Sequence, residues 1–306
     1  MTFRNSIFVI GSSNTDMVVK TSRLPAPGET VIGGSFLMNP GGKGANQAVA
    51  AARLGGQVTF VAKIGNDMFG KQAIRQFHHE KIDSCFLVTD PDHPSGVALI
   101  NVDNEGENSI VVAPGSNASL KHSDVQPALD KLSDRDILLL QLEIPLETVE
   151  YAITQAFEKG CRIILNPAPA QKLSAEVLSN LYIITPNETE AELLTGIKVH
   201  NEQTAKQAAE KLCQAGVRNV IVTLGAKGAY VHNDTISQLI SAPPVAAVDT
   251  TAAGDCFNGA LAVALSENVD LPQAVVFACK AASVSVTRMG AQSSLPHRKE
   301  LERVCL

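Results

Sequence analysis

Short apolar runs alternate with amphipathic helical stretches along most of this chain, and that alternation limits the folds available to it. The expected strands are Ile7–Ile10, Val58–Ala62, Ile137–Leu140, Ile163–Leu165, Ile183–Ile184, Val220–Thr223 and Val245–Val248. The expected helices are Gly44–Leu54, Phe69–His79, Leu146–Lys159, Glu188–Leu194, Thr204–Ala215, Asp255–Ser266 and Leu271–Thr287. Nearly continuous apolar strands separated by helices are typical of a sheet buried on both faces. The sequence therefore predicts one α/β domain over residues 1–306, with a mostly parallel central sheet covered by helices on both faces.

Two regions interrupt this alternation, at about residues 15–39 and 95–113. The first holds short β-like pieces at Met17–Lys20 and Thr30–Ile32, and the second reads as the strands Val97–Val102 and Ser109–Val112. Turn residues between β-branched runs indicate hairpins. We expect both regions to form a small antiparallel β-sheet that is inserted in the core and acts as a lid, excluding water from a site. The alternative is that the hairpins extend the core sheet.

Composition limits the possible partners. The net charge of −6 argues against nucleic acid or an anionic membrane as the main partner, but not against a nucleotide, because backbone amides can hold phosphates. The apolar runs are too short to span a bilayer, and no long apolar signal segment precedes Ile7. The six cysteines are scattered without metal-like spacing, and the histidines form no ligand pattern. We expect reduced thiols and a cytoplasmic protein.

The segment Asp249-Thr-Thr-Ala-Ala-Gly-Asp255 stands between an expected strand and an expected helix. Free N–H groups at a helix N-terminus bind anions, and small side chains let a phosphate approach the backbone. A carboxylate at Asp255 could there accept a proton from an attacking alcohol, which suits phosphoryl transfer. A helix capped after a glycine turn explains the segment equally well.

The segment Pro40-Gly-Gly-Lys-Gly-Ala-Asn-Gln47 is neither a P-loop nor a dinucleotide fingerprint. It lacks Ser or Thr after the Gly-Lys pair, and it lacks the third glycine of the fingerprint. It offers a flexible turn into an Ala-rich helix, where ligand hydroxyls could approach the main chain. A tight structural turn is the alternative.

Further polar residues follow expected strands, where open α/β sheets bind ligands. Asn14, Asp16 and Glu143 could bond sugar hydroxyls, although Asn14 and Asp16 also suit Asx turns. Asn187 and Glu190 match a capping box, and the same side chains could support Mg²⁺ through water. The glycines of Thr223–Gly228 would let a nucleotide lie against the backbone.

Taken together, these segments resemble the ribokinase-like (PfkB) family of carbohydrate kinases over nearly the whole chain. The matching segments are Gly11–Asp16, Pro27–Thr30, Gly41–Ala48, Gly96–Ile100, Asn166–Ala170, Thr185–Glu190, Thr223–Gly228, Asp249–Asp255 and Val286–Gln292. The resemblance implies a Rossmann-like core and ATP-dependent phosphorylation of a small sugar, with D-ribose as the expected acceptor at its 5-hydroxyl. The alternatives are 2-deoxyribose or another small sugar, or a non-catalytic sugar or nucleotide sensor on the same fold.

The resemblance also implies roles for individual residues. Asp255 would be the general base, and the amides of Ala252, Ala253 and Gly254 would form the anion hole. The sugar would be held, together with Asp255, by Asn14, Asp16, Gly42, Lys43, Asn46 and Glu143. ATP would contact Asn187, Thr223, Leu224, Gly225, Ala226, Lys227, Gly228, Gly254 and Cys279. Glu190 would arrange Mg²⁺ through water.

Two further expectations follow from the resemblance. A monovalent cation, K⁺, would be bound by Asp249 together with Thr251, Ser285, Arg288, Gly290 and Ser294. Its role would be to order the anion-hole loop. A homodimer would form through the lid sheet. Cys256 stands where many relatives carry a hydroxyl residue, and Cys279 occupies a position that varies in the family.

Overall fold

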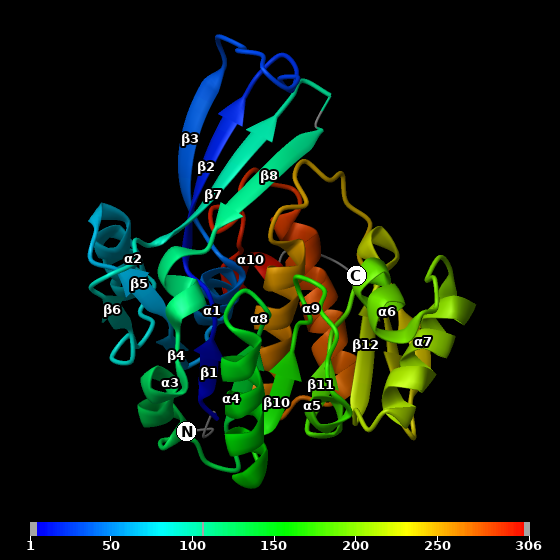
Figure 1. Cartoon of the computed structure of the whole chain (residues 1–306). Coiled ribbons are helices and arrows are strands. Elements are labelled where there is room, and N and C mark those ends of the chain that lie inside the picture. Colours follow the sequence, from blue (N-terminus) through cyan, green and yellow to red (C-terminus); the bar gives the residue numbers. More distant parts are fainter. Residues whose placement is uncertain (1–4, 106, 303–306) are drawn as a thin grey trace.

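The computed structural model describes residues 5–105 and 107–302, and its centre is an eight-stranded sheet (Figure 1). The strands are β1 (Ile7–Ile10), β4 (Val58–Val61), β9 (Ile137–Leu140), β10 (Arg162–Leu165), β11 (Ile183–Ile184), β12 (Asn219–Thr223), β13 (Ala229–His232) and β14 (Ser237–Ile240). Their order is β14-β13-β12-β11-β10-β9-β1-β4, and only the pairs β12–β13 and β13–β14 are antiparallel. The mostly parallel core predicted from the sequence is confirmed.

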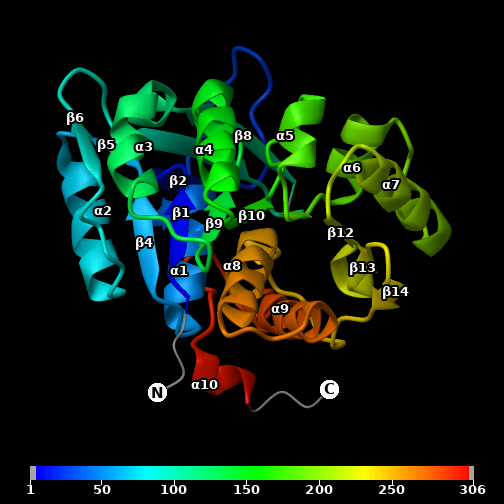
Figure 2. The same cartoon turned by 90° about the horizontal axis from the view of Figure 1, so that it is seen from below.

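Helices cover both faces of this sheet. One face carries α1 (Lys43–Arg53), α8 (Ala253–Ser266) and α9 (Leu271–Ser285), and the other carries α3 (His122–Leu129), α4 (Leu146–Glu158), α5 (Ala175–Ser179), α6 (Glu188–Thr195) and α7 (Glu202–Gln214) (Figure 2). Strand side chains alternate between two cores: Ile7 and Val9 pack on the α8 side, whereas Phe8 and Ile10 pack on the α4 side. This two-sided burial explains why the strands read as unbroken apolar runs.

A second sheet of four strands projects from the core (Figure 1). It consists of β2 (Asn14–Lys20), β3 (Ser35–Gly41), β7 (Gly96–Val102) and β8 (Asn108–Ala113), in the order β3-β2-β7-β8. The two hairpins are antiparallel, as expected, and they join through a parallel pair of β2 with β7. The hairpins therefore form a separate sheet and do not extend the core.

Two predicted strands are wrong. Val245–Val248 forms no strand; the N–H groups of Val248 and Asp249 both bond the carbonyl of Val286. Two prolines precede this run, which removes ladder donors, so its apolar residues do not pair with a neighbouring strand. Thr30–Ile32 is also not a strand, and Ile32 is 95% exposed. The chain instead turns through Gly33 and Gly34, both at positive φ, and pairs from Ser35 onward.

Several elements escaped prediction because their patterns are short. They are β13, β14, α3, α5, α10 (Arg298–Leu301) and the two-stranded sheet of β5 (Lys63–Gly65) and β6 (Val88–Asp90). The remaining helix, α2 (Met68–His79), lies beside this small sheet (Figure 2). Cys85, Cys161, Cys213, Cys256 and Cys279 are free thiols, as expected, whereas Cys305 lies outside the described residues. Over the described residues, none of the helices has the length and apolarity needed to cross a bilayer.

Candidate active site

Asp255 lies in the first turn of α8 and is buried where α8 packs against α1. Its Oδ2 accepts a hydrogen bond from Asn46 Nδ2 at 3.0 Å, and its Oδ1 accepts one from Gln47 Nε2 at 3.0 Å. Burial raises the pKa of the Asp255 carboxyl, and the charge of Lys43 and the two amides partly oppose that rise. A buried carboxylate with a raised proton affinity is suited to general-base chemistry.

Gln47 connects Asp255 to a chain of buried amides. Its Nε2 also donates to Asn166 Oδ1 at 3.0 Å, and its Oε1 accepts from Gln141 Nε2 at 2.6 Å. Among the described residues, Asn46 Oδ1 and Gln141 Oε1 are buried acceptors that lack a partner. Sequence reasoning assigned Gln47 no role, although a glutamine directly before the alanine-rich run of this helix was a signal of a buried polar function.

The residues expected to hold a sugar gather next to Asp255. Glu143 Oε2 accepts from Ser12 Oγ at 2.6 Å and from the backbone N–H of Lys43 at 2.9 Å. The carboxylate of Asp16 lies over Gly41, so closely that a Cβ on that glycine would be 2.2 Å from Asp16 Oδ2. The expected sugar site is therefore assembled from the ends of two strands and the start of α1.

Charges within this group perturb one another. Burial, together with the charges of Glu143 and Asp255, raises the pKa of Asp16 to about 6, against the opposing charge of Lys43. Burial alone would lower the pKa of Lys43, but the surrounding carboxylates raise it above its ordinary value. Those carboxylates, in order of decreasing influence, belong to Asp255, Glu143, Glu190 and Asp16. Lys43 is thus the cation at the centre of an acidic site.

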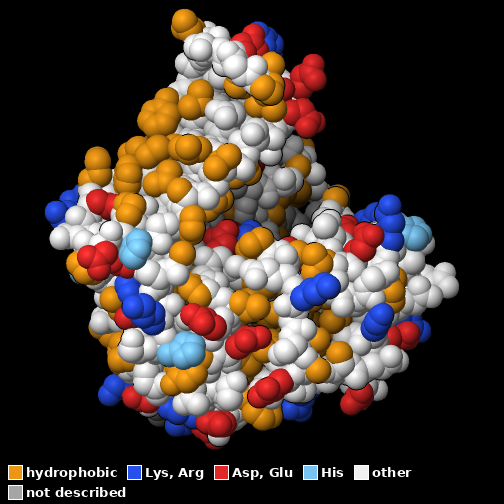
Figure 3. All heavy atoms as spheres, viewed as in Figure 1, with side chains coloured by type: hydrophobic (Ala, Val, Ile, Leu, Met, Phe, Trp, Pro, Cys, Tyr) orange, Lys and Arg blue, Asp and Glu red, His pale blue; other side chains and the backbone are white. Residues whose placement is uncertain are grey.

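A cavity of about 650 Å³ opens beside Asp255. Its lining includes, from the predicted site, Lys43, Asn187, Glu190, Thr223, Gly225, Ala226, Gly228, Ala252, Ala253, Gly254, Asp255 and Cys279, whereas Leu224 and Lys227 do not line it. Another wall is formed by Pro243, Pro244, Val245 and Ala247, the last two of which belong to the segment wrongly predicted as a strand. This volume suits a ligand of nucleotide size. The molecular face in Figure 3 is hollowed beneath the projecting sheet.

The loop before α8 has an unusual backbone. Ala252 adopts a left-handed conformation with φ of 59°, which is costly for a residue with a Cβ and is often stored at functional sites. The Ala253 N–H donates to Thr250 O at 3.2 Å, so this amide is engaged in a turn. A Cβ on Gly254 would meet no atom within 4 Å, and this residue lines the cavity. The helix N-terminus therefore faces open space, which an anion can enter.

Asn187 and Glu190 form the capping box that was the structural alternative for their spacing. Asn187 Oδ1 accepts from the Glu190 N–H at 2.8 Å, and Glu190 Oε2 accepts from the Asn187 N–H at 2.9 Å. Both side chains also line the cavity, and burial raises the pKa of Glu190. Asn187 and Glu190 therefore cap α6 and also face the cavity.

Asp249 ties two loops together behind the helix start. Its Oδ1 accepts from the Thr251 N–H at 2.9 Å, and its Oδ2 accepts from the Gly290 N–H at 2.8 Å. Burial alone would raise the pKa of Asp249, but the Thr251 side chain, together with these two N–H groups, holds it below its ordinary value, so the carboxylate is charged at neutral pH. The hydroxyls of Ser285 and Ser294 donate to the carbonyls of Ala282 and Ala291 within their own turns. An ionised carboxylate among backbone and hydroxyl oxygens is a donor set compatible with a hard monovalent cation.

Comparisons with known proteins agree with one another. The model of the pfkB family of carbohydrate kinases matches residues 4–298. A ribokinase of Haemophilus influenzae is 46% identical over 297 residues, covering 97% of each chain. A deoxyribokinase of Salmonella typhi is 39% identical and covers 95% of each chain. The structure of Arabidopsis thaliana ribokinase complexed with ribose and ATP superposes with a TM-score of 0.89 at 31% identity, covering 98% of each chain.

Proposed function

The chain belongs to the pfkB family of carbohydrate kinases, and from that premise we propose that it transfers the γ-phosphoryl group of ATP to the 5-hydroxyl of D-ribose. The observation that carries this proposal is the position of Asp255 between the expected sugar residues and the 650 Å³ cavity. The ribose and ATP bound to the Arabidopsis relative support the choice of substrates. The deoxyribokinase relative makes 2-deoxyribose the second candidate acceptor.

In this mechanism Asp255 accepts the proton of the sugar hydroxyl as it attacks the γ-phosphorus in line. Asn46 and Gln47 orient the two carboxylate oxygens, and Lys43 opposes the negative charge gathered at the site. The start of α8, at Ala252, Ala253 and Gly254, stabilises the charge on the transferred phosphoryl group. In the described conformation the Ala253 amide is bonded to Thr250, so its use as an anion donor requires the loop to rearrange.

The residues around the cavity also fit the remaining ligands. Asn187, Thr223, Gly225, Ala226, Gly228 and Cys279 would hold ATP. Glu190 would hold Mg²⁺ through water, and the ion supplies charge neutralisation to the phosphates when bound. Asp249, Thr251, Ser285, Arg288, Gly290 and Ser294 would hold K⁺, which supplies a fixed positive charge next to the anion loop.

The decisive experiment measures ADP release with ATP, Mg²⁺ and K⁺ in the presence of D-ribose, 2-deoxyribose, fructose, adenosine or no acceptor. A rate stimulated mainly by ribose is the expected result. Stimulation mainly by 2-deoxyribose would keep the chemistry and change the acceptor. ATP binding without acceptor-stimulated ADP release would reject the enzyme in favour of a sensor.

Ribose affinity is expected to fall as the pH is lowered through about 6, because the pKa of Asp16 is raised to about 6. The sugar hydroxyls need an ionised acceptor, and protonation of one required group costs up to about tenfold in affinity per pH unit below its pKa. Calorimetric titration with ribose between pH 5 and 8, without nucleotide, measures this. Asp16→Asn is the control and should bind weakly at every pH. A flat profile in the unaltered protein would rule out Asp16 as the acceptor.

Turnover is expected to depend on K⁺. The Asp249 carboxylate links Thr251 to Gly290 and so lies next to the strained Ala252, where a bound cation would order the loop. Initial rates and melting temperatures in K⁺, Na⁺ and cation-free buffers of equal ionic strength test this. Asp249→Asn should abolish the response of both quantities. Equal rates and equal melting temperatures in all three buffers would reject the proposed cation site.

The projecting sheet is proposed to act both as a lid and as a dimer interface. Phe36, Leu99 and Val111 are between 50% and 63% exposed on the face of this sheet opposite Asp16, and hydrophobic side chains gather over the sheet in Figure 3. Apolar patches of this kind usually mark interaction surfaces. Sedimentation analysis is expected to give a dimer that Val111→Asp dissociates. A monomer at micromolar concentration would reject the interface.

A further inference from the structure

Asn117 is a buried hydrogen-bonding residue outside the expected site. It lies in the short 3-10 helix η1 (Gly115–Ser119) and is 1% exposed. Its Oδ1 accepts from the backbone N–H of Ser13 at 2.9 Å. Its Nδ2 donates to the carbonyl of Ser13 at 3.2 Å and to Oδ1 of Asn14 at 2.7 Å. Asn117 therefore holds Ser13 and Asn14, at the start of β2, through three hydrogen bonds.

The chemistry of the partners fixes the orientation of both amides. A backbone N–H can only donate, so the Asn117 atom facing the N–H of Ser13 must be its oxygen. Nδ2 of Asn117 is then the atom that faces Asn14, and because it is a donor its partner on Asn14 must be the oxygen. Asn14 must consequently direct its own Nδ2 away from Asn117. Over residues 5–105 and 107–302, no hydrogen bond occupies that Nδ2.

Asn14 and Asp16 share one face of β2, because side chains two residues apart in a strand point the same way. The Asp16 carboxylate leans over Gly41, and Gly41 is the residue paired with Asn14 across β3. The N–H₂ group of Asn14, a donor, and the carboxylate of Asp16, an acceptor, therefore lie close together on this face. A hydroxyl that lies between them can accept from Asn14 and donate to Asp16, which satisfies both of its functions.

We propose that Asn117 is a positioning residue that holds the amide of Asn14 with its N–H₂ toward the sugar. This inference rests on the proposed function. Through Asn117 the site selects a hydroxyl at one sugar position, because a group that lacks either a donor or an acceptor leaves Asn14 or Asp16 unpaired.

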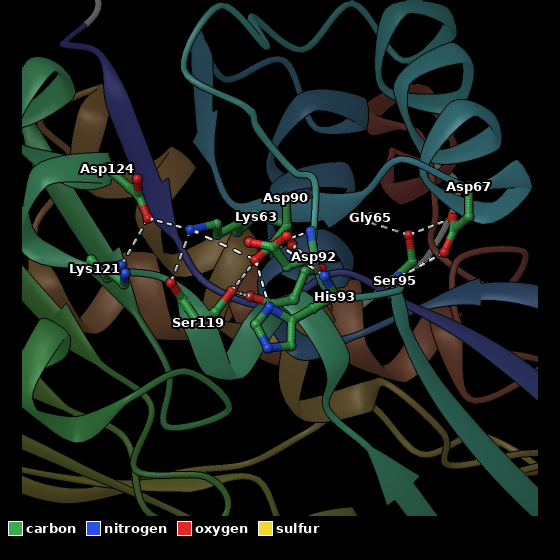
Figure 4. Close-up of polar contacts among 11 residues, drawn as sticks. Lys63, Gly65, Asp67, Asp90, Asp92, His93, Ser95, Ser119, Lys121 and Asp124 are labelled. Atoms are coloured by element: carbon green, nitrogen blue, oxygen red, sulfur yellow. Dashed lines mark hydrogen bonds and ion pairs between the residues drawn. The ribbon is translucent and has the colours of Figure 1, made fainter.

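The surrounding structure holds Asn117 rigidly. Ser116 Oγ donates to the carbonyl of Lys63 at 2.9 Å, and Lys63 Nζ donates to the carbonyl of Ser119 at 3.0 Å. Figure 4 shows Lys63 between Ser119 and the carboxylates of Asp90 and Asp124. Ser116 and Ser119 of η1 are therefore both anchored to β5, and the helix cannot shift without breaking these hydrogen bonds.

Gly96 supplies the space that the Asn117–Asn14 contact needs. A Cβ on Gly96 would lie 2.2 Å from both Asn117 Nδ2 and Asn14 Oδ1. The hydrogen bond thus passes directly over the Cα of this glycine, which is paired with Asn14 in the sheet. The glycine at the start of β7 is explained by this contact.

The test is Asn117→Asp, which keeps an acceptor for the Ser13 N–H but removes the donor to Asn14. Asn14 is then expected to turn its amide and present oxygen to the sugar. The KM for ribose should rise about tenfold or more, and the KM for ATP should change less than about twofold. Discrimination against one of 1-, 2- and 3-deoxyribose should fall in the same variant. An unchanged ribose KM and unchanged discrimination would overturn the proposal.

Two controls separate positioning from stability. Asn219→Asp makes the same amide-to-carboxylate change at a buried asparagine at the start of β12, where it loses the hydrogen bond to the carbonyl of Tyr182, and it should lower the melting temperature without raising the ribose KM. In the Asn14→Ala background, Asn117→Asp should add less than about twofold to the ribose KM, because its effect acts through Asn14. Full additivity, or a raised ribose KM in Asn219→Asp, would assign Asn117 a merely structural role.

A measurement on the unaltered protein covers the case in which Asn117→Asp does not fold. With ¹⁵N-labelled asparagine, the Asn14 side-chain amide signals should shift on ribose addition, and the Asn117 signals should stay within a linewidth. Unmoved Asn14 signals in a protein that phosphorylates ribose would overturn the role of Asn117 alone. No ribose-dependent ADP release by the unaltered chain would overturn the proposed function, and the inference with it.

Discussion

Asp255→Asn is expected to lower turnover by about 10²- to 10⁴-fold and to leave the affinity for ATP close to that of the unaltered protein. The change removes the carboxylate that we propose as the base for the sugar hydroxyl. The carboxylate lies beside the nucleotide cavity without supplying most of its walls, so ATP binding should survive. Rapid-quench turnover and calorimetric ATP titration measure the two quantities.

The fold should tolerate this substitution because the neighbouring amides can adapt. The introduced amide can keep its oxygen toward Gln47 Nε2, replacing the acceptor that Asp255 Oδ1 supplies. Its N–H₂ would then face Asn46, whose Oδ1 has no partner among the described residues and can rotate to accept. The burial that raises the pKa of Asp255 also means that a neutral group is not penalised there.

Glu210→Gln is the matched control for this prediction. It makes the same carboxylate-to-amide change in α7, on a side chain that is 41% exposed and pairs only loosely with Lys206 at 3.8 Å. Its turnover should equal that of the unaltered protein. A rate within about threefold of the unaltered protein for Asp255→Asn itself would show that another group takes the proton, and the assignment would fall.

The second large effect is expected from Gln47→Leu, which should reduce the free energy of unfolding by about 2–5 kcal/mol. The substitution leaves Asn166 Oδ1 and Gln141 Nε2 buried without their partner, and it removes one of the two amides bonded to Asp255. Each buried polar atom left unpaired costs about 1–3 kcal/mol. Urea unfolding followed by circular dichroism measures the loss.

Gln47→Leu should also move the acid limb of the activity profile to higher pH. The hydrogen bond from Gln47 lowers the pKa of Asp255, so its removal raises that pKa further, and Asp255, the proposed base, is protonated at a higher pH. The profile of kcat between pH 5 and 9 shows the shift. An acid limb that stays in place would mean that Gln47 is only a packing residue.

Gln141→Leu is the graded comparison within the same chain of amides. Gln141 Oε1 is already a buried acceptor without a partner in the described part of the chain, so its removal costs nothing there. Only Gln47 Oε1 loses a donor, and the expected cost is about 1 kcal/mol. The acid limb should move less than in Gln47→Leu. A loss in the free energy of unfolding equal to that of Gln47→Leu would contradict the central place of Gln47 among these hydrogen bonds.

Some parts of the site could be predicted because their signals are local. Asn187 and Glu190 stand three residues apart at a helix start, and the structure shows both bonds of the capping box. Other parts gave no local signal. The contacts of Gln47 with Gln141 and Asn166 span 94 and 119 residues, and those of Asn117 with Asn14 span 103. No spacing rule within a strand or helix reaches such partners.

The two wrong strands have a related explanation. Val245–Val248 has the apolar composition of a strand, but a strand also needs a neighbour with free backbone groups. The two prolines before this run and the bonds of Val248 and Asp249 to Val286 direct the segment along the cavity wall. The apolar composition of this run therefore predicted burial wrongly, since Val248 is 59% exposed.

The sequence by itself determined the parallel core, the projecting sheet and the positions of most loops around the cavity, but not that of the loop at Val245–Val248. This was possible because the spacing of hydrophobic residues, the turn residues and the strand ends are local properties of the sequence. Only the tertiary structure decided which oxygen of Asp255 meets which amide, that Ala252 is left-handed and that Asn117 fixes Asn14. The hydrogen bonds of Asp255 and of Asn117 join residues about 100 or more positions apart, and their geometry exists only once the sheets have paired and α8 has packed on α1.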